Sequence, residues 1–162
     1  MKALVIGCGK FGVRVSEYLA RKNHDVIVID NSPETFLALS EEFTGRTICG
    51  VGYDKDVLEQ AGIASADVVI GCTSSDSLNA VVANIAKNVF HVPTVIARMY
   101  DPIRARMFES MGIYTVSITR LGLDNVMEYL EGNRSHSQIG KRCPACKGTN
   151  SCQLGGEKVF RV

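Results

Sequence analysis

Residues 3–12 read ALVIGCGKFG, a short apolar run that leads directly into a Gly-x-Gly-x-x-Gly motif. The apolar run predicts a buried β-strand, and the spacing of apolar residues after the motif predicts a helix. Between a strand and a helix, Gly7 permits a tight turn, Gly9 lets the backbone approach a pyrophosphate, and Gly12 lets helix and strand pack closely. The N–H groups at the start of the helix, at the positive end of its dipole, would then hold the phosphates.

An acidic residue further along the chain supports this interpretation. A second apolar run, residues 26–29, ends in Asp30. An acidic side chain roughly 20 positions after the motif, at the tip of the second strand, accepts hydrogen bonds from the hydroxyls of an adenosine ribose. The two signals together predict a site for an adenine nucleotide or dinucleotide.

Strands and helices alternate along the first 130 residues. The apolar runs predict strands at residues 3–6, 26–29, 47–49, 68–70, 94–97 and 113–118. Helical spacing predicts helices that begin near residue 11 and cover residues 33–43, 54–61, 78–89, 102–111 and 121–130. This alternation predicts a parallel sheet with right-handed crossovers and helices on both faces, that is, a Rossmann-like doubly wound α/β domain over residues 1–130.

Apolar stripes in two of these helices are expected to contribute to the core. Val81, Val82 and Ile85 share one stripe of the helix at 78–89, and Met127 and Leu130 lie on one face of the last helix. The last helix is also a candidate for a dimer contact.

The composition excludes several classes of protein. The 162 residues carry a formal net charge of +1 and contain no Lys/Arg block, so no nucleic-acid partner is expected. No apolar run approaches the roughly 20 residues that a transmembrane helix needs, and the first residues show no signal-peptide pattern. Cys8, Cys49 and Cys72 lie in or beside predicted strand ends, where we expect small buried side chains of a protein in a reducing cytoplasm.

Residues 131–162 differ from the rest of the chain: a polar linker leads into an irregular, cysteine-containing tail with little apolar content. Cys143 and Cys146 have the two-residue spacing of a zinc-binding knuckle, and Cys152 with His136 would complete a tetrahedral set of ligands. One Cys-x-x-Cys is only half of a zinc signature. A disordered tail with reduced thiols, or a redox pair at Cys143 and Cys146, therefore stays open as an alternative.

The sequence contains binding groups but no evident catalytic set. His24 and His91 precede strands, so they are expected at the edge of the sheet opposite the nucleotide crevice. No Ser/His/Asp set or pair of carboxylates follows the strands, and only about thirty residues follow the sheet, fewer than a substrate domain needs. The residues favour a binding protein over an enzyme, and a small NAD-dependent oxidoreductase subunit remains the alternative.

The first 130 residues also resemble the TrkA-N domain, known too as RCK-N, which is the nucleotide-binding regulatory domain of Trk/Ktr-type potassium transporters. The resemblance is carried by the glycine motif, Asp30, the segments 56–63, 66–69, 95–98 and 111–113, and Thr73 with Asp76 and Asn79. It implies that the chain binds ATP, ADP, AMP or NAD(H), assembles as a homodimer or higher oligomer, and regulates a membrane-embedded potassium or related cation transporter from the cytoplasm. A nucleotide-binding partner domain without a transport role is a further alternative.

The fold and the resemblance together define a candidate nucleotide site. Lys10 stands where ATP-responsive members often have arginine, and the resemblance implies that it reaches a β- or γ-phosphate. Arg98 would pair with a phosphate or a neighbouring subunit, or else form a structural salt bridge, and Asp76 is expected to cap its helix. Val51 replaces the Asp or Asn common in the family, which weakens one polar contact to adenosine. The complete set is Gly7, Cys8, Gly9, Lys10, Phe11, Gly12, Asp30, Asn31, Gly50, Val51, Thr73, Ser74 and Arg98.

Overall fold

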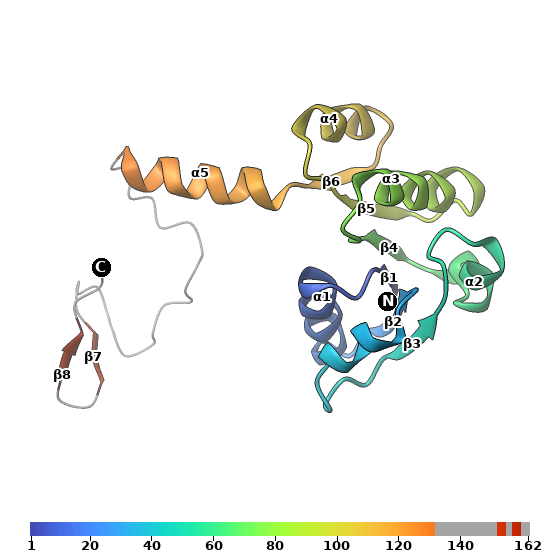
Figure 1. Cartoon of the computed structure of the whole chain (residues 1–162), viewed down its shortest axis with the longest axis horizontal. Coiled ribbons are helices and arrows are strands. Elements are labelled where there is room, and N and C mark those ends of the chain that lie inside the picture. The colour runs from blue at the N-terminus through green and yellow to red at the C-terminus, as the bar shows by residue number, and fades with distance from the viewer. Residues whose placement is uncertain (132–151, 155–156, 160–162) are drawn as a thin grey trace. The chain divides into compact units, whose positions relative to one another are not determined.

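The computed structural model describes residues 1–131, 152–154 and 157–159, and the chain divides into two units. The first unit, residues 1–124, contains a parallel six-stranded sheet and its helices (Figure 1). The second unit, residues 125–162, contains the end of helix α5 and a two-stranded hairpin. Within the described residues, no helix combines the length and the apolar character that crossing a membrane requires.

The elements of the first unit alternate as the sequence predicts. In chain order they are β1 (Lys2–Ile6), α1 (Lys10–Arg21), β2 (Asp25–Asp30), the 3-10 helix η1 (Pro33–Ala38), β3 (Arg46–Cys49), α2 (Lys55–Gln60), the 3-10 helix η2 (Ile63–Ser65), β4 (Val68–Gly71), α3 (Asp76–Asn84), the π-helical turn η3 (Ile85–Val89), β5 (Thr94–Arg98), α4 (Pro102–Ser110), β6 (Tyr114–Val116) and α5 (Ile118–Leu130). β6 is shorter than the strand predicted at 113–118, because Ile118 already begins α5.

The six strands lie in the order β3-β2-β1-β4-β5-β6, and every neighbouring pair is parallel. At the end of β1, Ile6 pairs with Ile29 of β2 on one side and with Gly71 of β4 on the other. The chain winds outward from β1 in both directions, so the strand order reverses between β1 and β4. The carboxyl ends of strands at such a reversal border the ligand crevice of an open parallel sheet. The predicted Rossmann-like doubly wound α/β class is confirmed.

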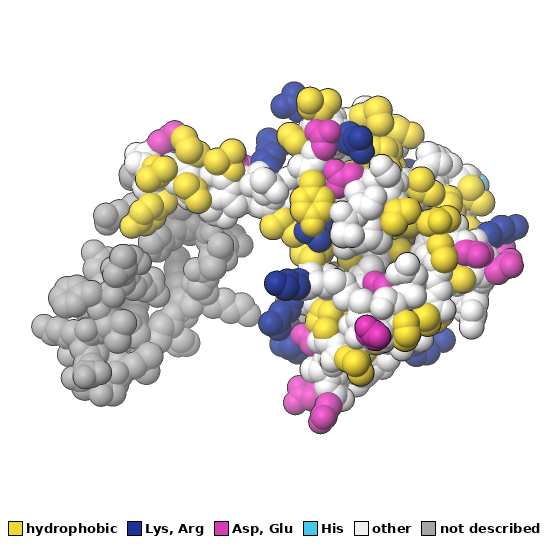
Figure 2. All heavy atoms as spheres, viewed as in Figure 1, with side chains coloured by type: hydrophobic (Ala, Val, Ile, Leu, Met, Phe, Trp, Pro, Cys, Tyr) yellow, Lys and Arg dark blue, Asp and Glu magenta, His cyan; other side chains and the backbone are white. Residues whose placement is uncertain are grey.

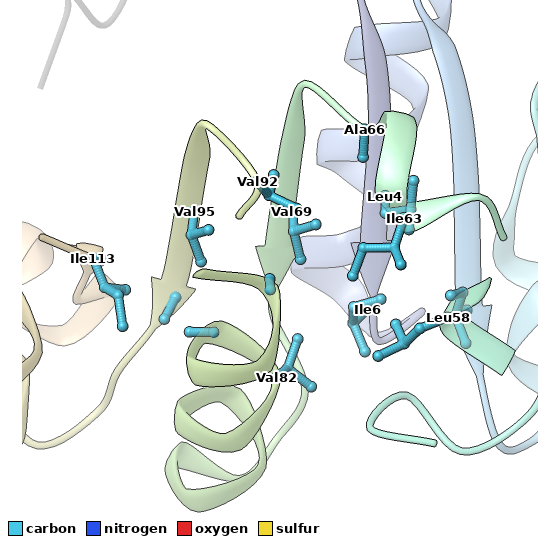
Figure 3. Close-up of a cluster of buried hydrophobic side chains, with 14 of the residues drawn as sticks. Leu4, Ile6, Leu58, Ile63, Ala66, Val69, Val82, Val92, Val95 and Ile113 are labelled. Carbon is cyan, nitrogen blue, oxygen red and sulfur yellow. The ribbon is translucent and has the colours of Figure 1, made fainter. Parts of the chain in front are cut away.

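Alternate residues of the central strand enter two cores, one on each face of the sheet. The first core, drawn in Figure 3, lies under α2, α3 and α4, and its largest members include Leu4, Ile6, Leu58, Ile63, Val69, Val82 and Val95. The second core lies under α1 and η1 and includes Ala3, Val5, Val13 and Val28, with the partly buried Phe36 packed against it. Because helices cover both faces, the central strands are buried throughout. Each fully buried Leu or Ile stabilises the fold by about 1.5–3 kcal/mol relative to an exposed one.

The segment after β2 is not the α-helix that was predicted for residues 33–43. η1 ends at Ala38, and Leu39 already has an extended backbone with φ −74° and ψ 139°. Phe36, Leu39 and Phe43 nevertheless pack against the core under α1. The apolar spacing correctly identified the side chains that pack on the core, where they are partly buried. It does not specify which carbonyl each N–H bonds, so a 3-10 helix followed by extended chain satisfies the same pattern.

Two helices present faces that differ from the predicted ones. In α3, Asn79 and Val82 are buried, whereas Val81 is 44% exposed. In α5, Met127 and Leu130 are 44% and 70% exposed, so neither belongs to the core. The stripe predicted at 78–89 is therefore right for Val82 and for Ile85, which packs against the core, but wrong for Val81, and it left out the polar Asn79. In α5, Met127 and Leu130 share one face with Leu123 and Val126, and all four are exposed in the described part of the chain.

Most of the predicted zinc site lies outside the described residues, namely His136, Cys143 and Cys146. Cys152 begins β7 (Cys152–Leu154), which pairs in antiparallel fashion with β8 (Glu157–Val159), so this part of the tail is a hairpin rather than irregular chain. Among the residues that the structure describes, no group of three or more His, Cys, Asp or Glu side chains is arranged to hold a metal ion. Zinc binding in the tail stays a prediction without support.

Helix α1 lies close to the end of β1 because residue 12 is glycine. A Cβ at Gly12 would overlap the carbonyl oxygen of Gly7 and come within 3.1 Å of the Cys72 sulfur. Gly7 has φ +106°, and a Cβ there would lie 2.8 Å from the backbone nitrogen of Thr73. These two contacts fix the position of α1 relative to the ends of β1 and β4.

We expect Gly12→Ala to destabilise the protein by about 2–3 kcal/mol, because the added methyl group forces α1 away from the strand. Urea denaturation gives this free energy of unfolding. Gly9→Ala is the matched control: no atom lies within 4 Å of its Cβ position, so the loss should stay below about 1 kcal/mol. Equal stability of the two variants would show that the close approach of α1 is not required.

Candidate functional site

A cleft of about 680 Å³ lies at the carboxyl ends of the strands, where the strand order reverses. The glycine loop and the residues after β2 and β3 form one wall, and the residues after β4 and β5 form the other. Nine of the predicted site residues line the cleft: Gly7, Gly9, Lys10, Asp30, Asn31, Val51, Thr73, Ser74 and Arg98. The fold therefore brings together groups that lie far apart in the sequence.

The N-terminus of α1 opens into this cleft without a protein cap. Gly9 is the N-cap residue, the first turn contains no acidic residue, and no side chain of the described residues caps the helix. The space where a Cβ of Gly9 would lie is empty to 4 Å. The first N–H groups of a helix lack intrahelical partners and carry the positive end of the dipole. An anion can approach them beside Gly9.

Asp30 connects the glycine loop to the turn that follows β2. One carboxylate oxygen accepts a hydrogen bond from the backbone N–H of Cys8 at 2.6 Å, and the other accepts one from Ser32 at 3.0 Å. A carboxylate offers about four acceptor positions. Asp30 can therefore hold the loop and still accept hydrogen bonds from the hydroxyls of a ligand.

The opposite wall carries Arg98, a cation that no carboxylate of the described residues neutralises. The Arg98 guanidinium lies 4.4 Å from the centre of the Tyr100 ring and 5.8 Å from that of Phe11, and it donates a hydrogen bond to the Tyr100 hydroxyl. Its Nε atom is buried without a partner. The ion pairs of the described residues include neither Arg98 nor Lys10, so the predicted structural salt bridge of Arg98 is not present there. With two cations and one carboxylate along its walls, the cleft favours anions.

The prediction that Asp76 caps α3 is wrong. Ser75 is the N-cap residue and accepts a hydrogen bond from Leu78. The Asp76 carboxylate instead accepts hydrogen bonds from the backbone N–H groups of Tyr100 and Asp101 at 2.8–3.0 Å. Ser75 and Asp76 are both residue types that cap helices, so the sequence alone does not decide between them. In the structure the loop after β5 supplies the backbone donors that Asp76 bonds.

Four predicted residues do not line the cleft but contact groups that do, or permit their close packing: Cys8, Phe11, Gly12 and Gly50. Cys8 donates its backbone N–H to Asp30, and the Phe11 ring packs on Arg98. Gly12 permits the approach of α1, and a Cβ at Gly50 would lie 2.8 Å from a Val57 methyl group of α2. These residues shape the cleft without facing into it.

The cleft also has lining residues that the sequence analysis missed. They come from the loops and helix starts around the sheet edge and include Ser32, Thr35, Gly52, Tyr53, Leu78 and Tyr100. For Tyr100 a signal existed, because it follows Arg98 at the exit of β5. Whether the other missed residues line the cleft depends on the path of each loop, and the spacing of the strands in the sequence does not specify that path.

The cysteines near the cleft are packing residues rather than nucleophiles. Burial raises the pKa of the Cys72 thiol to about 12, which outweighs the opposite effect of nearby Arg98. Its sulfur donates to the carbonyl oxygens of Ile6 and Gly7, beneath the glycine loop. Burial also raises the pKa of Cys8. Cys49 is exposed rather than buried as predicted, because β3 is the edge strand of the sheet.

The lining groups of the cleft suit binding better than proton transfer. None of the described residues that line it is a histidine, and Asp30, their one carboxylate, is engaged by two backbone N–H groups. A general base needs a group with a pKa near the working pH that can reach the substrate. The cleft instead offers backbone donors, two cations and small hydroxyls.

Comparison with known proteins agrees with this geometry. The family model described as "TrkA-N domain" matches residues 3–119. The Trk system potassium uptake protein TrkA of Streptomyces coelicolor is 37% identical over 130 residues, which cover 80% of this chain and 58% of that protein. The chain thus spans little more than half the length of this curated relative.

Solved structures share the fold at low sequence identity. The Shewanella denitrificans Kef CTD, in its AMP-bound form, superposes with a TM-score of 0.69 at 20% identity and covers 84% of each chain. The GsuK channel bound to NAD superposes with a TM-score of 0.64 at 22% identity, covering 74% of this chain and 22% of that one. GsuK has also been solved bound to ADP, with a TM-score of 0.63 and 22% identity over 74% of this chain and 32% of that one. Identities this low show similarity of fold alone.

We expect alkylation to distinguish the exposed Cys49 from the buried Cys72. Near pH 8, iodoacetamide should modify Cys49 at least about tenfold faster than Cys72, because only the thiolate reacts and the raised pKa keeps Cys72 protonated. Peptide mapping by mass spectrometry measures each site separately, with the urea-unfolded protein as the control in which the rates converge. Rapid modification of Cys72 in the folded protein would contradict the packing role.

Proposed function

The chain belongs to the TrkA-N domain family, and on this premise we propose that it is the nucleotide-binding regulatory domain of a potassium or related cation uptake system. In this proposal it binds ATP, ADP, AMP or NAD(H), acts by binding rather than catalysis, and works from the cytoplasm on a membrane-embedded transporter subunit. The observation that carries the proposal is the cleft that brings together the uncapped N-terminus of α1, Asp30, Lys10 and Arg98, the last two being outside the ion pairs of the described residues.

The ligand pose follows from the donors and acceptors of the cleft. The phosphates lie beside Gly9 against the N–H groups of α1, since that is the open, positively polarised position. The ribose hydroxyls donate to Asp30. The base lies against the loop after β3, where Val51 and Tyr53 are 39% and 47% exposed and line the cleft. Groups beyond the first phosphate then extend toward Lys10 and Arg98.

The ligands named for the solved neighbours support this range of nucleotides. The Kef domain was solved with AMP, and GsuK with NAD and with ADP. Each contains an adenosine and a phosphate, which are the parts that Asp30 and the glycine loop would hold. A turnover assay with nicotinamide cofactors separates this binding role from that of an oxidoreductase subunit.

The second part of the proposal is assembly through α5. Among the exposed apolar side chains of this helix, Leu123, Val126, Met127 and Leu130 share one face by their spacing, whereas Ile118, Leu121 and Tyr129 lie elsewhere around it. Figure 2 shows exposed apolar side chains along this part of the chain. Arg120, Asp124 and Glu128 are spaced four residues apart and form a charged stripe along one side of this apolar face. A helix with one uncovered apolar face is stabilised when a second copy covers it. We therefore infer a homodimer or a higher oligomer.

Nucleotide binding tests the first part. Isothermal titration with AMP, ADP, ATP, NAD and NADH should detect at least one ligand, and Asp30→Ala should weaken its binding about tenfold or more by removing the acceptor for the ribose. Asp25→Ala is the matched control, because Asp25 lies at the opposite end of the same strand and pairs with Arg46 on the surface. Absence of binding by every nucleotide, or unchanged affinity in Asp30→Ala, would refute the site.

Light scattering coupled to size exclusion tests the second part. Val126→Glu places a charge in the apolar face of α5 and should convert the oligomer to a monomer, because an unpaired carboxylate is costly to bury. Asp124→Ala, on the charged face of the same helix, should leave the mass unchanged. A monomeric wild-type protein at concentrations of tens of micromolar would remove the assembly proposal while leaving nucleotide binding intact.

A further inference from the structure

Asn79 is a fully buried polar residue whose amide makes four hydrogen bonds. Its oxygen accepts from the backbone N–H and from the hydroxyl of Thr73, both at 2.8 Å. Its nitrogen donates to the carbonyl oxygens of Thr73 at 3.1 Å and of Arg98 at 2.8 Å. An amide has two acceptor positions and two donors, so Asn79 uses its whole capacity. It ties the loop after β4 to the end of β5.

Asp76 ties the same helix to the next part of the chain. Its carboxylate accepts the backbone N–H groups of Tyr100 and Asp101. Asp101 in turn caps α4 by accepting a hydrogen bond from Ile103. Asp76 and Asn79 are three residues apart on α3, so both lie on one side of its first turns.

The groups held by these two residues form one wall of the cleft. Thr73, Arg98 and Tyr100 all line it. Asn79 fixes the backbone of Arg98, and Asp76 fixes the backbone of Tyr100, whose ring flanks the guanidinium. The other flank of the guanidinium is Phe11 of α1. The place of this cation over the cleft therefore depends on α3, although neither Asp76 nor Asn79 lines the cleft.

We propose that Asp76 and Asn79 are positioning residues that hold Arg98 at the cleft, so that the site distinguishes nucleotides by the phosphates beyond the first. Through the same hydrogen bonds, a phosphate bound at Arg98 also affects the start of α4. The inference rests on the proposed nucleotide-binding function. The first phosphate lies on the glycine loop, which these residues do not touch. A second or third phosphate reaches the side of Arg98, whose buried Nε has no partner in the described residues. The hydrogen bonds of Asp76 and Asn79, which together form a clamp, connect the end of β5 to the N-cap of α4.

The experiment measures the affinities for AMP, ADP and ATP by isothermal titration. In Asp76→Ala we expect the preference for ADP or ATP over AMP to fall at least about fivefold, while AMP affinity changes less than about twofold, because two backbone donors that position Tyr100 and Asp101 lose their acceptor. Asp76→Asn retains one acceptor oxygen and should restore part of the preference. Asp67→Ala is the matched control: its carboxylate accepts the backbone N–H of Lys2, but it lies before β4, at the other edge of the sheet.

A second variant and a second measurement test whether Asp76→Ala changes the preference only by disturbing the fold. Arg98→Gln leaves the clamp in place and should lose the same preference. Hydrogen exchange with mass spectrometry should show protection of residues 98–105 by ATP in the wild-type protein, and much less in Asp76→Ala.

The possible outcomes separate the two proposals. If AMP and ATP affinities fall in parallel in Asp76→Ala, or if Arg98→Gln keeps the full preference, the positioning role is refuted while nucleotide binding stands. The same conclusion follows if the wild-type protein binds AMP and ATP equally well. If the wild-type protein binds no nucleotide, both the function and this inference fail.

Discussion

The close approach of Gly12 to the carbonyl oxygen of Gly7 holds α1 over the end of β1, and the candidate site depends on this contact. It directs the N-terminus of α1 into the space at the reversal of the strand order. It also brings the N–H of Cys8 to the carboxylate of Asp30, which fixes the loop against β2. A larger residue at position 12 would separate helix and strand and open this arrangement.

Around this contact, the cleft combines groups that favour an anionic ligand. The helix start has no acidic residue in its first turn, and Lys10 and Arg98 form no ion pair among the described residues. The cysteine beneath the loop remains a thiol because burial raises its pKa. These lining groups favour an anionic ligand, and Asp30 is the one carboxylate among the described residues of the lining. Membership of the TrkA-N family agrees with a binding domain.

Helix α3 has a second role beyond covering the sheet. Its buried amide and its first-turn carboxylate connect the loop after β4, the end of β5 and the cap of α4. Loss of a partner of the fully buried Asn79 would cost stability, since its amide or the groups that it bonds would remain unsatisfied. The wall of the cleft and the start of α4 therefore form one hydrogen-bonded network.

The sequence by itself determined the strands, the glycine turn, the place of Asp30 and the family, because each of these leaves a local pattern of apolar runs, glycine spacing or ordered motif residues. Nine of the thirteen predicted nucleotide-site residues line one cleft for the same reason. Only the tertiary structure decided that Asp76 bonds Tyr100, 24 residues away, that Asn79 bonds Arg98, 19 residues away, and that Cys49 is exposed. Those contacts depend on how separate loops meet at the edge of a twisted sheet. A hydrogen bond between distant segments leaves no pattern in the sequence. Any donor that the fold brings within about 3 Å of the acceptor can form it.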